Sequence, residues 1–335
     1  MKEIESEFIF ALTNTGSESA LKLEVESTGL GWRLSYQRRG FVTFKAVSDD
    51  DFFSLGTLNH ELACARRLCL SLGKLSTLDE AERKIKLHPA YLGGPIHHVR
   101  FINRRMEGES ETEPRLPEEG DCVGTVVELG PEEFWAGLHL HGPFLSRDPG
   151  GYSPLVMPAD SPSRAWLKLE EAVRFFNLQL TPLDLVVELG CAPGGVVLAL
   201  LQRGISVIGV DPAQMADIVM ERAVIERRYV PLDKAWFYHC RKPAALVSKR
   251  DLGKNVTWFM SDMNQSPEVV LKECARFCKM AQTIDGVLIT LKLTEMSQVA
   301  DKRKWFDSLI AMGFRTIRLQ QFSVHHKEFA LLALR

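Results

Sequence analysis

A strand, a glycine-rich turn and a helix are predicted to follow one another without a break in residues 185–201. The run Leu185–Leu189 is apolar except for Glu188 and indicates a strand buried on both faces. Three glycines in residues 190–195 allow the backbone to turn sharply and let a ligand approach main-chain N–H groups without a Cβ in the way. The apolar segment Val196–Leu201 can then begin a helix whose N-terminus faces the turn. This arrangement predicts an open α/β sheet with a ligand at the turn.

The spacing of the glycines and acids indicates which ligand binds there. The β-rich run Ser206–Asp211 ends in a carboxylate about 20 residues after the first glycine, where a mononucleotide-binding unit holds a ribose hydroxyl. The turn has the pattern E-x-G-x-x-x-G-G, whereas a dinucleotide site has G-x-G-x-x-G. Glu188 would repel a pyrophosphate but favour a ligand that carries positive charge. S-adenosylmethionine (SAM), with its sulfonium and amino groups, therefore fits better than NAD. Taken alone, the loop is also compatible with an ordinary turn that binds nothing.

The composition limits the class of protein. At 335 residues the chain fits two or three domains, and its hydrophobic content of 45% supports large cores. No apolar run is long enough to span a membrane, and the acidic start Met1–Phe8 lacks the apolar segment of a signal peptide. The seven cysteines include no C-x-x-C pair, which favours a reduced, cytoplasmic protein. Neither cysteines nor histidines show metal-binding spacing, so we expect no metal. A monomer is expected.

The net charge of −2 is distributed unevenly along the chain. Residues 156–335 contain 24 Lys and Arg against 19 Asp and Glu, whereas residues 1–155 contain 17 against 24. A positive C-terminal part favours a nucleic-acid partner, and a negative N-terminal part opposes one. Much of the acidity lies in residues 106–121, which have no periodicity and indicate a solvated loop. The acidic residues of this loop need not face a substrate.

The first 155 residues predict a smaller α+β region. Strands and helices are expected in the order β-α-β-β-α-β, which suggests a ferredoxin-like unit over residues 1–75. These elements cover residues 7–13, 18–25, 32–37, 41–47, 50–58 and 67–74. A helix and three strands of a second small sheet follow in residues 76–155. They cover residues 76–87, 98–103, 123–129 and 134–141. The Pro- and Gly-rich residues 142–160 mark the boundary to the domain that follows.

In residues 156–335, charged residues stand where the expected elements meet the ligand. Asp262 and Lys292 end two β-rich runs, Glu328 begins the last strand, and Lys168 lies on a helix that starts near Ser161. Ligands of open parallel sheets bind at the carboxyl ends of the strands, so we expect these charges in the same crevice as the glycine turn. Taken singly, each could be a solvated or salt-bridged surface charge, and for a lone Lys or Glu that is the better interpretation. Four together favour a site.

Several motifs in this order resemble one enzyme family. S-R-A-W-L-K-L-E-E, E-L-G-C-A-P-G-G, S-D-M, T-L-K and the terminal K-E-F look like the FtsJ-like RNA ribose 2′-O-methyltransferases. The more specific resemblance is to the bacterial 23S rRNA (cytidine 2′-O) methyltransferases of type M. It rests on Val210–Met215, Trp258–Met263 and Leu291–Leu293, and on the upstream segments Ala136–His139 and Ser153–Leu155. The motifs span roughly residues 135–335, and several in order are more specific than one.

The resemblance implies a fold and a set of site residues. Residues 156–335 would form a Rossmann-like SAM-dependent methyltransferase domain, with a mostly parallel seven-stranded sheet and a C-terminal antiparallel hairpin. Residues 76–155 would be a reduced THUMP-like RNA-binding unit. The family's Lys-Asp-Lys-Glu tetrad falls on Lys168, Asp262, Lys292 and Glu328. The expected cofactor contacts are Glu188, Gly190, Cys191, Ala192, Pro193, Gly194, Gly195, Asp211, Asp262 and, as the acid that holds the adenine, Asp233. The implied partner is large-subunit rRNA.

The chemistry of methyl transfer explains why these residue types are needed. A ribose hydroxyl is a poor nucleophile until a general base removes its proton. Lysine is a base only when neutral, a form that burial or a second nearby cation favours. Lys168 beside Lys292 would supply that cation, and Asp262 and Glu328 would orient the ammonium groups. We therefore assign Lys292 as the base, Asp262 as its partner and a neighbour of the cofactor, and Lys168 and Glu328 as groups that steer the ribose.

Three classes of function stay open from the sequence. They are an RNA ribose methyltransferase, which the motifs favour, a SAM-dependent enzyme on a small molecule or protein, and a non-catalytic RNA-binding descendant. Several basic clusters are candidate phosphate contacts, although each alone is more often a solvated face. These clusters are Arg38-Arg39, Arg66-Arg67, Arg104-Arg105, Arg227-Arg228 and Lys302-Arg303-Lys304.

Overall fold

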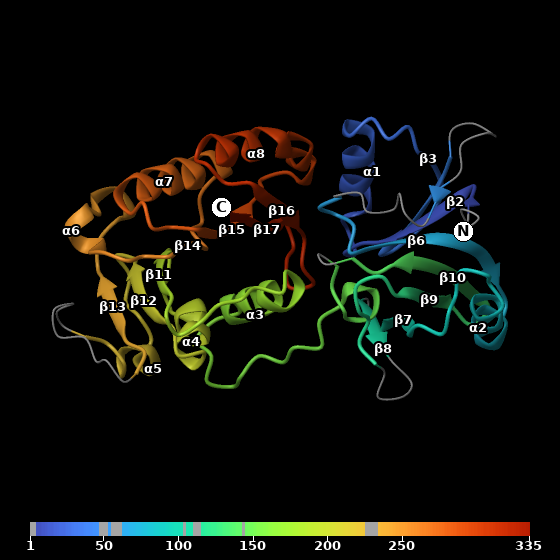
Figure 1. Cartoon of the computed structure of the whole chain (residues 1–335), viewed down its shortest axis with the longest axis horizontal. Coiled ribbons are helices and arrows are strands. Elements are labelled where there is room, and N and C mark those ends of the chain that lie inside the picture. The colour runs from blue at the N-terminus through green and yellow to red at the C-terminus, as the bar shows by residue number, and fades with distance from the viewer. Residues whose placement is uncertain are drawn as a thin grey trace. The chain divides into compact units, whose positions relative to one another are not determined.

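The chain forms two compact units (Figure 1). The first contains Met1–Pro154 and Gln320–Ser323, and the second contains Leu155–Leu319 and Val324–Arg335. The structure is a computed structural model. It describes residues 5–46, 53–54, 62–102, 105–109, 115–142, 145–224 and 234–335. Among these residues no helix is both long and apolar enough to cross a membrane.

The first unit is built on one eight-stranded sheet with the strand order β3-β4-β2-β6-β10-β9-β7-β8. In that order the strands are Arg33–Arg38, Phe41–Lys45, Phe8–Leu12, Arg67–Leu75, Glu133–Leu140, Cys122–Gly130, Ile96–Ile102 and Arg105–Glu109. Helix α1 (Glu18–Ser27) and helix α2 (Leu78–Lys86) join strands of this sheet. Helix α2 begins at Thr77, whose side chain accepts a hydrogen bond from the N–H of Glu80, as expected of an N-cap. Its buried Ala81 and Ile85 pack on β9 and β10.

Two expectations for this unit are wrong. The second small sheet is not separate, because β10 pairs antiparallel with β6 from Phe134↔Leu75 onward and so joins both predicted segments in one sheet. The residue pair 75/76, expected as a boundary, lies at the end of β6 inside this unit. A helix was expected over residues 50–58, but Phe53–Ser54 forms strand β5. Its backbone pairs with β1 (Glu5–Ser6) and not with its own helical turn.

Two consecutive arginines at the start of β6, Arg66 and Arg67, lie inside the first unit. Arg66 and Arg67 are each 1% exposed, so the expectation that they contact phosphate is wrong. Arg67 donates to the carbonyl oxygens of Ser146 and Asp148, and Arg66 donates to that of Gly151. A buried guanidinium needs such acceptors because leaving water without them is costly. These arginines therefore hold the segment that follows β10. They do not face a ligand in solution.

The second unit has the expected seven-stranded sheet, with the order β13-β12-β11-β14-β15-β17-β16. In that order the strands are Phe237–Cys240, Ser206–Val210, Leu185–Leu189, Trp258–Ser261, Gly286–Lys292, Glu328–Leu334 and Thr316–Gln320. The first five are parallel, and β17 pairs antiparallel with β15. The central strands are buried on both faces, which explains their nearly continuous apolar sequences.

Helices cover both faces of this sheet (Figure 1). Helices α7 (Pro267–Met280) and α8 (Lys302–Ala311) lie on one face, and α3 (Ala165–Phe175) and α4 (Gly195–Gln202) lie on the other. The short helices α5 (Asp217–Met220) and α6 (Lys249–Leu252) and the 3-10 turns at Ala244–Leu246 and Met296–Asp301 connect the strands. Helix α7 begins with Pro267, which has a φ suited to the first helical position. Because β11, β14 and β15 are parallel, their carboxyl ends meet at one edge, where the site residues lie.

Candidate active site

The glycine turn after β11 brings three segments into close contact. Gly190 has φ +74° and Gly194, the N-cap of α4, has φ +116°, values that favour glycine. A Cβ at Gly190 would lie 2.9 Å from the backbone of Met263, next to Asp262. A Cβ at Gly195 would lie 2.3 Å from Oγ of Ser163, just before α3. Because these two glycines have no side chain, the segment that follows β14 and the segment that precedes α3 can both approach the turn.

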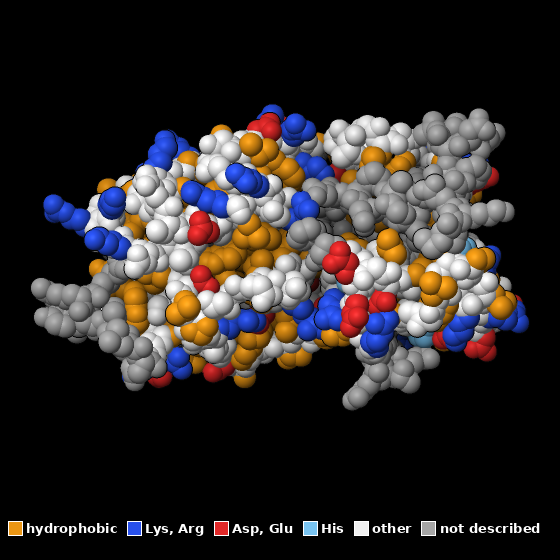
Figure 2. Space-filling view, viewed as in Figure 1, with side chains coloured by type: hydrophobic (Ala, Val, Ile, Leu, Met, Phe, Trp, Pro, Cys, Tyr) orange, Lys and Arg blue, Asp and Glu red, His pale blue; other side chains and the backbone are white. Residues whose placement is uncertain are grey.

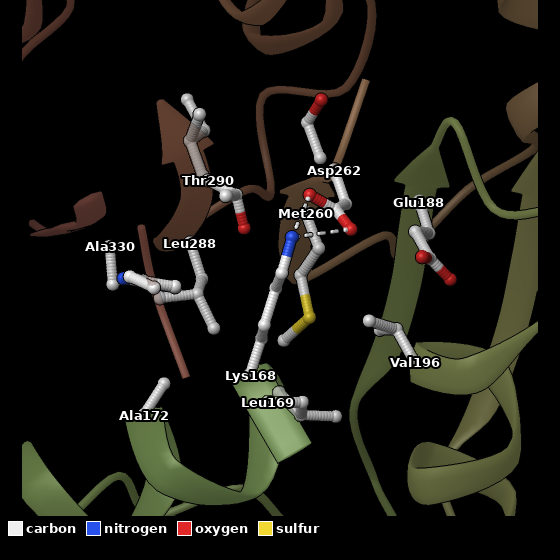
Figure 3. A pocket seen from close by; sticks show the side chains of 13 residues that line it. Lys168, Leu169, Ala172, Glu188, Val196, Met260, Asp262, Leu288, Thr290 and Ala330 are labelled. Atoms are coloured by element: carbon white, nitrogen blue, oxygen red, sulfur yellow. Dashed lines mark hydrogen bonds and ion pairs between the residues drawn. The ribbon is translucent and has the colours of Figure 1, made fainter. Parts of the chain in front are cut away.

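The four charged residues predicted as a tetrad lie together, and Figure 3 shows two of them, Lys168 and Asp262. Nζ of Lys168 is 3.0 Å from Oδ1 of Asp262 and 3.0 Å from Oε2 of Glu328. Nζ of Lys292 is 3.2 Å from Oδ1 of Asp262 and donates a 2.8 Å hydrogen bond to the main-chain oxygen of Asp262. The four side chains are between 15% and 23% exposed. Asp262 thus contacts both lysines in a partly buried cluster that solvent can still reach.

Strand pairing explains why these side chains meet. Lys292 and Glu328 are directly opposite each other in the antiparallel pair of β15 and β17. Asp262 follows β14, the neighbour of β15, and its N–H donates to the oxygen of Leu189 at the end of β11. Lys168 reaches the cluster from α3, on one face of the sheet (Figure 3). Lys168 and Glu328, which are 160 positions apart in the chain, therefore meet at one edge of the sheet.

A pocket extends from the tetrad toward β11. Apolar side chains from α3, α4 and the strands line much of it, and polar groups are added by Glu188, Thr290 and His325. The apolar lining consists of Leu169, Ala172, Val196, Met260, Leu288, Ile289 and Ala330. Such a lining excludes water and strengthens the electrostatic interactions of the polar groups inside.

Glu188 lies at the end of β11 and is 2% exposed. Its Oε2 has no hydrogen-bond partner among the described residues. Burial, helped by the nearby carboxylates of Asp262 and Asp211, raises the pKa of Glu188 well above its usual value. A buried acceptor without a donor is costly, and a ligand with an ammonium group would satisfy it. This carboxyl group therefore fits a cationic ligand.

Asp211 stands at the carboxyl end of β12, where the sequence places a ribose contact. Its Oδ1 accepts a 2.8 Å hydrogen bond from the N–H of Ala213, and its Oδ2 accepts a 3.2 Å bond from Ala192 in the glycine turn. These two bonds fix the carboxylate beside the turn and leave further lone pairs for a ligand hydroxyl. Asp211 therefore lies at the predicted position beside the glycine turn.

The other predicted cofactor residues are placed differently. Cys191 points inward, with Sγ 3.7 Å from Sδ of Met215, and burial raises the pKa of its thiol. Ala192 and Pro193 lie at the surface of the turn and are joined by a cis peptide bond. Asp233 lies outside the described residues. The strand that follows it, β13, begins at Phe237, so its carboxyl end is at Cys240.

Three residues near the tetrad were not predicted from the sequence. Thr290 lies two positions before Lys292 in β15. Because side chains alternate between the two faces of a strand, the sequence could have predicted that both residues lie on the same face. Ser163 packs against Gly195. It belongs to the S-R-A-W-L-K motif, but the motif did not indicate this contact. His325 lines the pocket from the connection before β17, and no sequence pattern indicated it.

Much of the second unit is similar to known methyltransferases. Residues 162–297 match the model of the FtsJ-like methyltransferase family. The chain is 28% identical to the ribosomal RNA large subunit methyltransferase M of Teredinibacter turnerae, over 95% of this chain and 96% of that protein. It is 37% identical to the enzyme of the same name from Vibrio vulnificus YJ016, over 35% of this chain and 30% of that protein.

Among solved structures, this chain is matched with Aeropyrum pernix fibrillarin with bound SAM. That match has 16% identity and a TM-score of 0.36, and covers 69% of this chain and 89% of fibrillarin. The family match and the unpaired Glu188 carboxyl beside the glycine turn agree in the cofactor, which is SAM. Residues 162–297, which carry the glycine turn, Lys168, Asp262 and Lys292, are therefore similar to the FtsJ-like methyltransferases.

Proposed function

We propose that this chain transfers a methyl group from SAM to the 2′-hydroxyl of a ribose in RNA, most specifically a cytidine of bacterial 23S rRNA. The type M relatives are named as methyltransferases of ribosomal RNA of the large subunit, which supports this class of substrate. The observation that carries the proposal is the position of Asp262, within 3.2 Å of both Lys168 and Lys292. Methylation of a hydroxyl needs a base and fixed charges around it, and this cluster provides both.

The proposed mechanism assigns one role to each member of the tetrad. Lys292, in its neutral form, accepts the hydroxyl proton while the ribose oxygen forms its bond to the methyl carbon and the bond from that carbon to sulfur breaks. SAM, when bound, supplies the methyl group on a good leaving group. Asp262 holds the amines of Lys168 and Lys292 at fixed positions. Lys168, held by Glu328, donates hydrogen bonds toward the ribose. In-line transfer depends strongly on such positioning.

The first unit would hold the RNA. Within the single sheet of this unit, we assign residues 1–75 to a ferredoxin-like part and residues 76–155 to a reduced THUMP-like part that contacts large-subunit rRNA. This is supported by the edge strand β3, whose Arg33 and Arg38 are exposed, and by the adjacent exposed Arg39. Cations on an exposed edge can contact phosphates without a large desolvation cost. A cytoplasmic monomer fits this assignment.

The test uses labelled SAM and an unmodified large-subunit rRNA transcript. After incubation, the RNA is digested to nucleosides, and the label is located on ribose or base by mass spectrometry. We expect 2′-O-methylcytidine with the wild-type chain and none with Lys292→Ala. Label on a base, or on a protein or small molecule in place of RNA, would contradict the proposal. Binding of RNA without transfer of label would identify a non-catalytic descendant.

A further inference from the structure

A group of cations on the second unit has no part in the proposed methyl transfer. Residues 241–254 contain five Lys and Arg and one acid, Asp251, although the whole chain has a net charge of −2. The cations are Arg241, Lys242, Lys249, Arg250 and Lys254, named here the α6 patch. All except Lys242 are exposed, and Figure 2 shows Lys and Arg side chains gathered over this end of the unit.

The α6 patch differs from the other basic cluster of this unit, Lys302-Arg303-Lys304, in how its charges are balanced. In that cluster Lys304 is 2.7 Å from Asp301 and Arg303 is 3.4 Å from Asp307, so acids offset two of the three cations. Lys249, Arg250 and Lys254 form no ion pair with any residue that the structure describes. The patch therefore presents an uncompensated positive charge.

The backbone that carries the patch is held rigidly. Asp251 accepts a 2.8 Å bond from Lys242 and a 2.8 Å bond from the hydroxyl of Ser248, which closes a capping box at α6. Arg276 of α7 donates to the carbonyl oxygens of Ala244 and Val247, and so fixes the turn before α6. A surface ordered before binding loses less conformational entropy when a ligand binds.

The α6 patch begins at the cofactor end of the sheet and continues along the connection to β14. Only its first residue, Arg241, is at this end: it follows β13 directly and donates from Nε to the oxygen of Pro212, one residue after Asp211. Lys249, Arg250 and Lys254 lie on the connection that leads to the start of β14 at Trp258, whereas Asp262 follows the end of that strand.

The geometry points to the α6 patch as a phosphate-binding surface that anchors RNA outside the methyl-transfer site. This inference rests on the proposed function and adds a contact surface to it. Lysine and arginine contacts with phosphate release counterions, so binding through the patch weakens as salt increases. The patch positions the substrate and takes no part in the chemistry.

The test compares two variants that each lose three positive charges. One is Lys249→Ala/Arg250→Ala/Lys254→Ala, and the matched control is Lys302→Ala/Arg303→Ala/Lys304→Ala. Affinity for an unmodified large-subunit rRNA transcript is measured by filter binding at several salt concentrations, affinity for SAM by calorimetry, and methyl transfer by label incorporation. Thermal unfolding checks that both variants fold, as expected for exposed side chains.

We expect the patch variant to bind RNA on the order of tenfold more weakly at low salt. Its slope of log affinity against log salt should be smaller by about 2 to 3, from roughly 0.7 to 0.9 per phosphate contact. Its KM for RNA should rise, while kcat and SAM affinity stay within about twofold of wild type. The control should change the slope by less than 1 unit.

A patch variant that binds RNA like wild type, or no more weakly than the control, overturns the inference while the proposed function stands. A wild-type chain that binds RNA but transfers no methyl group to it contradicts the proposed function. The slopes of log affinity against log salt then still decide whether the patch binds RNA. A wild-type chain that does not bind RNA overturns both.

Discussion

Nζ of Lys292 donates a 2.8 Å hydrogen bond to the main-chain oxygen of Asp262, so the backbone after β14 fixes the lysine at the end of β15. A main-chain acceptor stays in place whatever the charge of the amine is. The lysine can therefore give up or take a proton without losing its position beside the carboxylate of Asp262, 3.2 Å away. Neighbouring parallel strands thus present a positioned amine.

This relationship predicts that Lys292→Ala lowers kcat by about 10²- to 10⁴-fold, the usual contribution of a general base. Lys292→Arg should be as inactive, because an arginine keeps the positive charge but does not release its proton. Both variants should bind SAM and RNA like wild type. Single-turnover transfer of labelled methyl measures the effect, with the exposed Lys279→Ala as the control. Full activity in the arginine variant would show that charge, and not proton transfer, is what Lys292 supplies.

Replacing Gly195 tests how the glycine turn positions α3. In Gly195→Ala the new Cβ would lie 2.3 Å from Oγ of Ser163 and 2.9 Å from N of Trp166, so α3 has to shift. We expect a loss of about 1–3 kcal/mol in the free energy of unfolding, as for other overpacked sites. Methyl transfer should also fall, because Lys168 lies on α3. Gly130→Ala, where only Cβ of Glu133 lies within 4 Å, is the control. Unchanged unfolding and kcat would disprove this coupling.

The buried carboxyl of Glu188 predicts how SAM affinity depends on pH. Burial raises the pKa of Glu188, so the free protein holds a proton there at a pH where an exposed glutamate is ionised. Pairing with the ammonium of SAM requires the carboxylate, and binding therefore releases a proton. Affinity should increase as the pH rises toward the raised pKa and level off above it. Calorimetry in buffers of different ionisation enthalpy measures the proton release.

Glu188→Gln should abolish this pH dependence and weaken SAM binding above the raised pKa by on the order of tenfold or more, as for a lost charged hydrogen bond. The exposed Glu221→Gln is the matched control and should retain both the affinity and its pH dependence. Proton release that persists in Glu188→Gln would assign the effect to another group.

Buried histidines predict that the first unit is sensitive to acid. Burial, with the charge of Arg67 nearby, lowers the pKa of His97 to about 3. A histidine with a lowered pKa stabilises the fold above its unfolded value of about 6.5, and this stability is lost as the pH falls below that value. At pH 5 the loss for His97 alone is about 2 kcal/mol.

Hydrogen exchange of the β7 and β9 amides at pH 7 and pH 5, read by mass spectrometry and corrected for intrinsic rates, measures this loss. The protection factors of these amides should be smaller at pH 5 than at pH 7. His97→Met should reduce the difference, whereas the exposed His326→Met should leave it as in wild type. Equal protection at both pH values in the wild-type chain would exclude the effect.

Local sequence patterns predicted much of the second unit. Apolar runs that end in Asp211, Asp262 and Lys292 were expected as strands, and β12, β14 and β15 occupy these positions. The glycine turn before α4 was expected for the same reason, because backbone preference and hydrophobic periodicity act over a few residues. The Asp233 prediction cannot be compared, since that residue lies outside the described ranges.

The failures in the first unit have a common physical cause. The pairing of β6 with β10 joins residues about sixty positions apart, and no local pattern specifies which strand edge meets which. The burial of Arg66 and Arg67 depends equally on the distant carbonyl oxygens of residues 146–151. Adjacent arginines look like a surface cluster until such acceptors are known.

The sequence by itself determined the types of side chain available and the strand ends that carry them. That Lys168 and Lys292 contact the same carboxylate was decided by the tertiary structure, through the strand order β11-β14-β15-β17 and the packing of α3 against the glycine turn. The strand ends are fixed locally, by hydrogen bonding and chain stiffness. The contact of the two lysines with one carboxylate depends on which distant surfaces can bury one another.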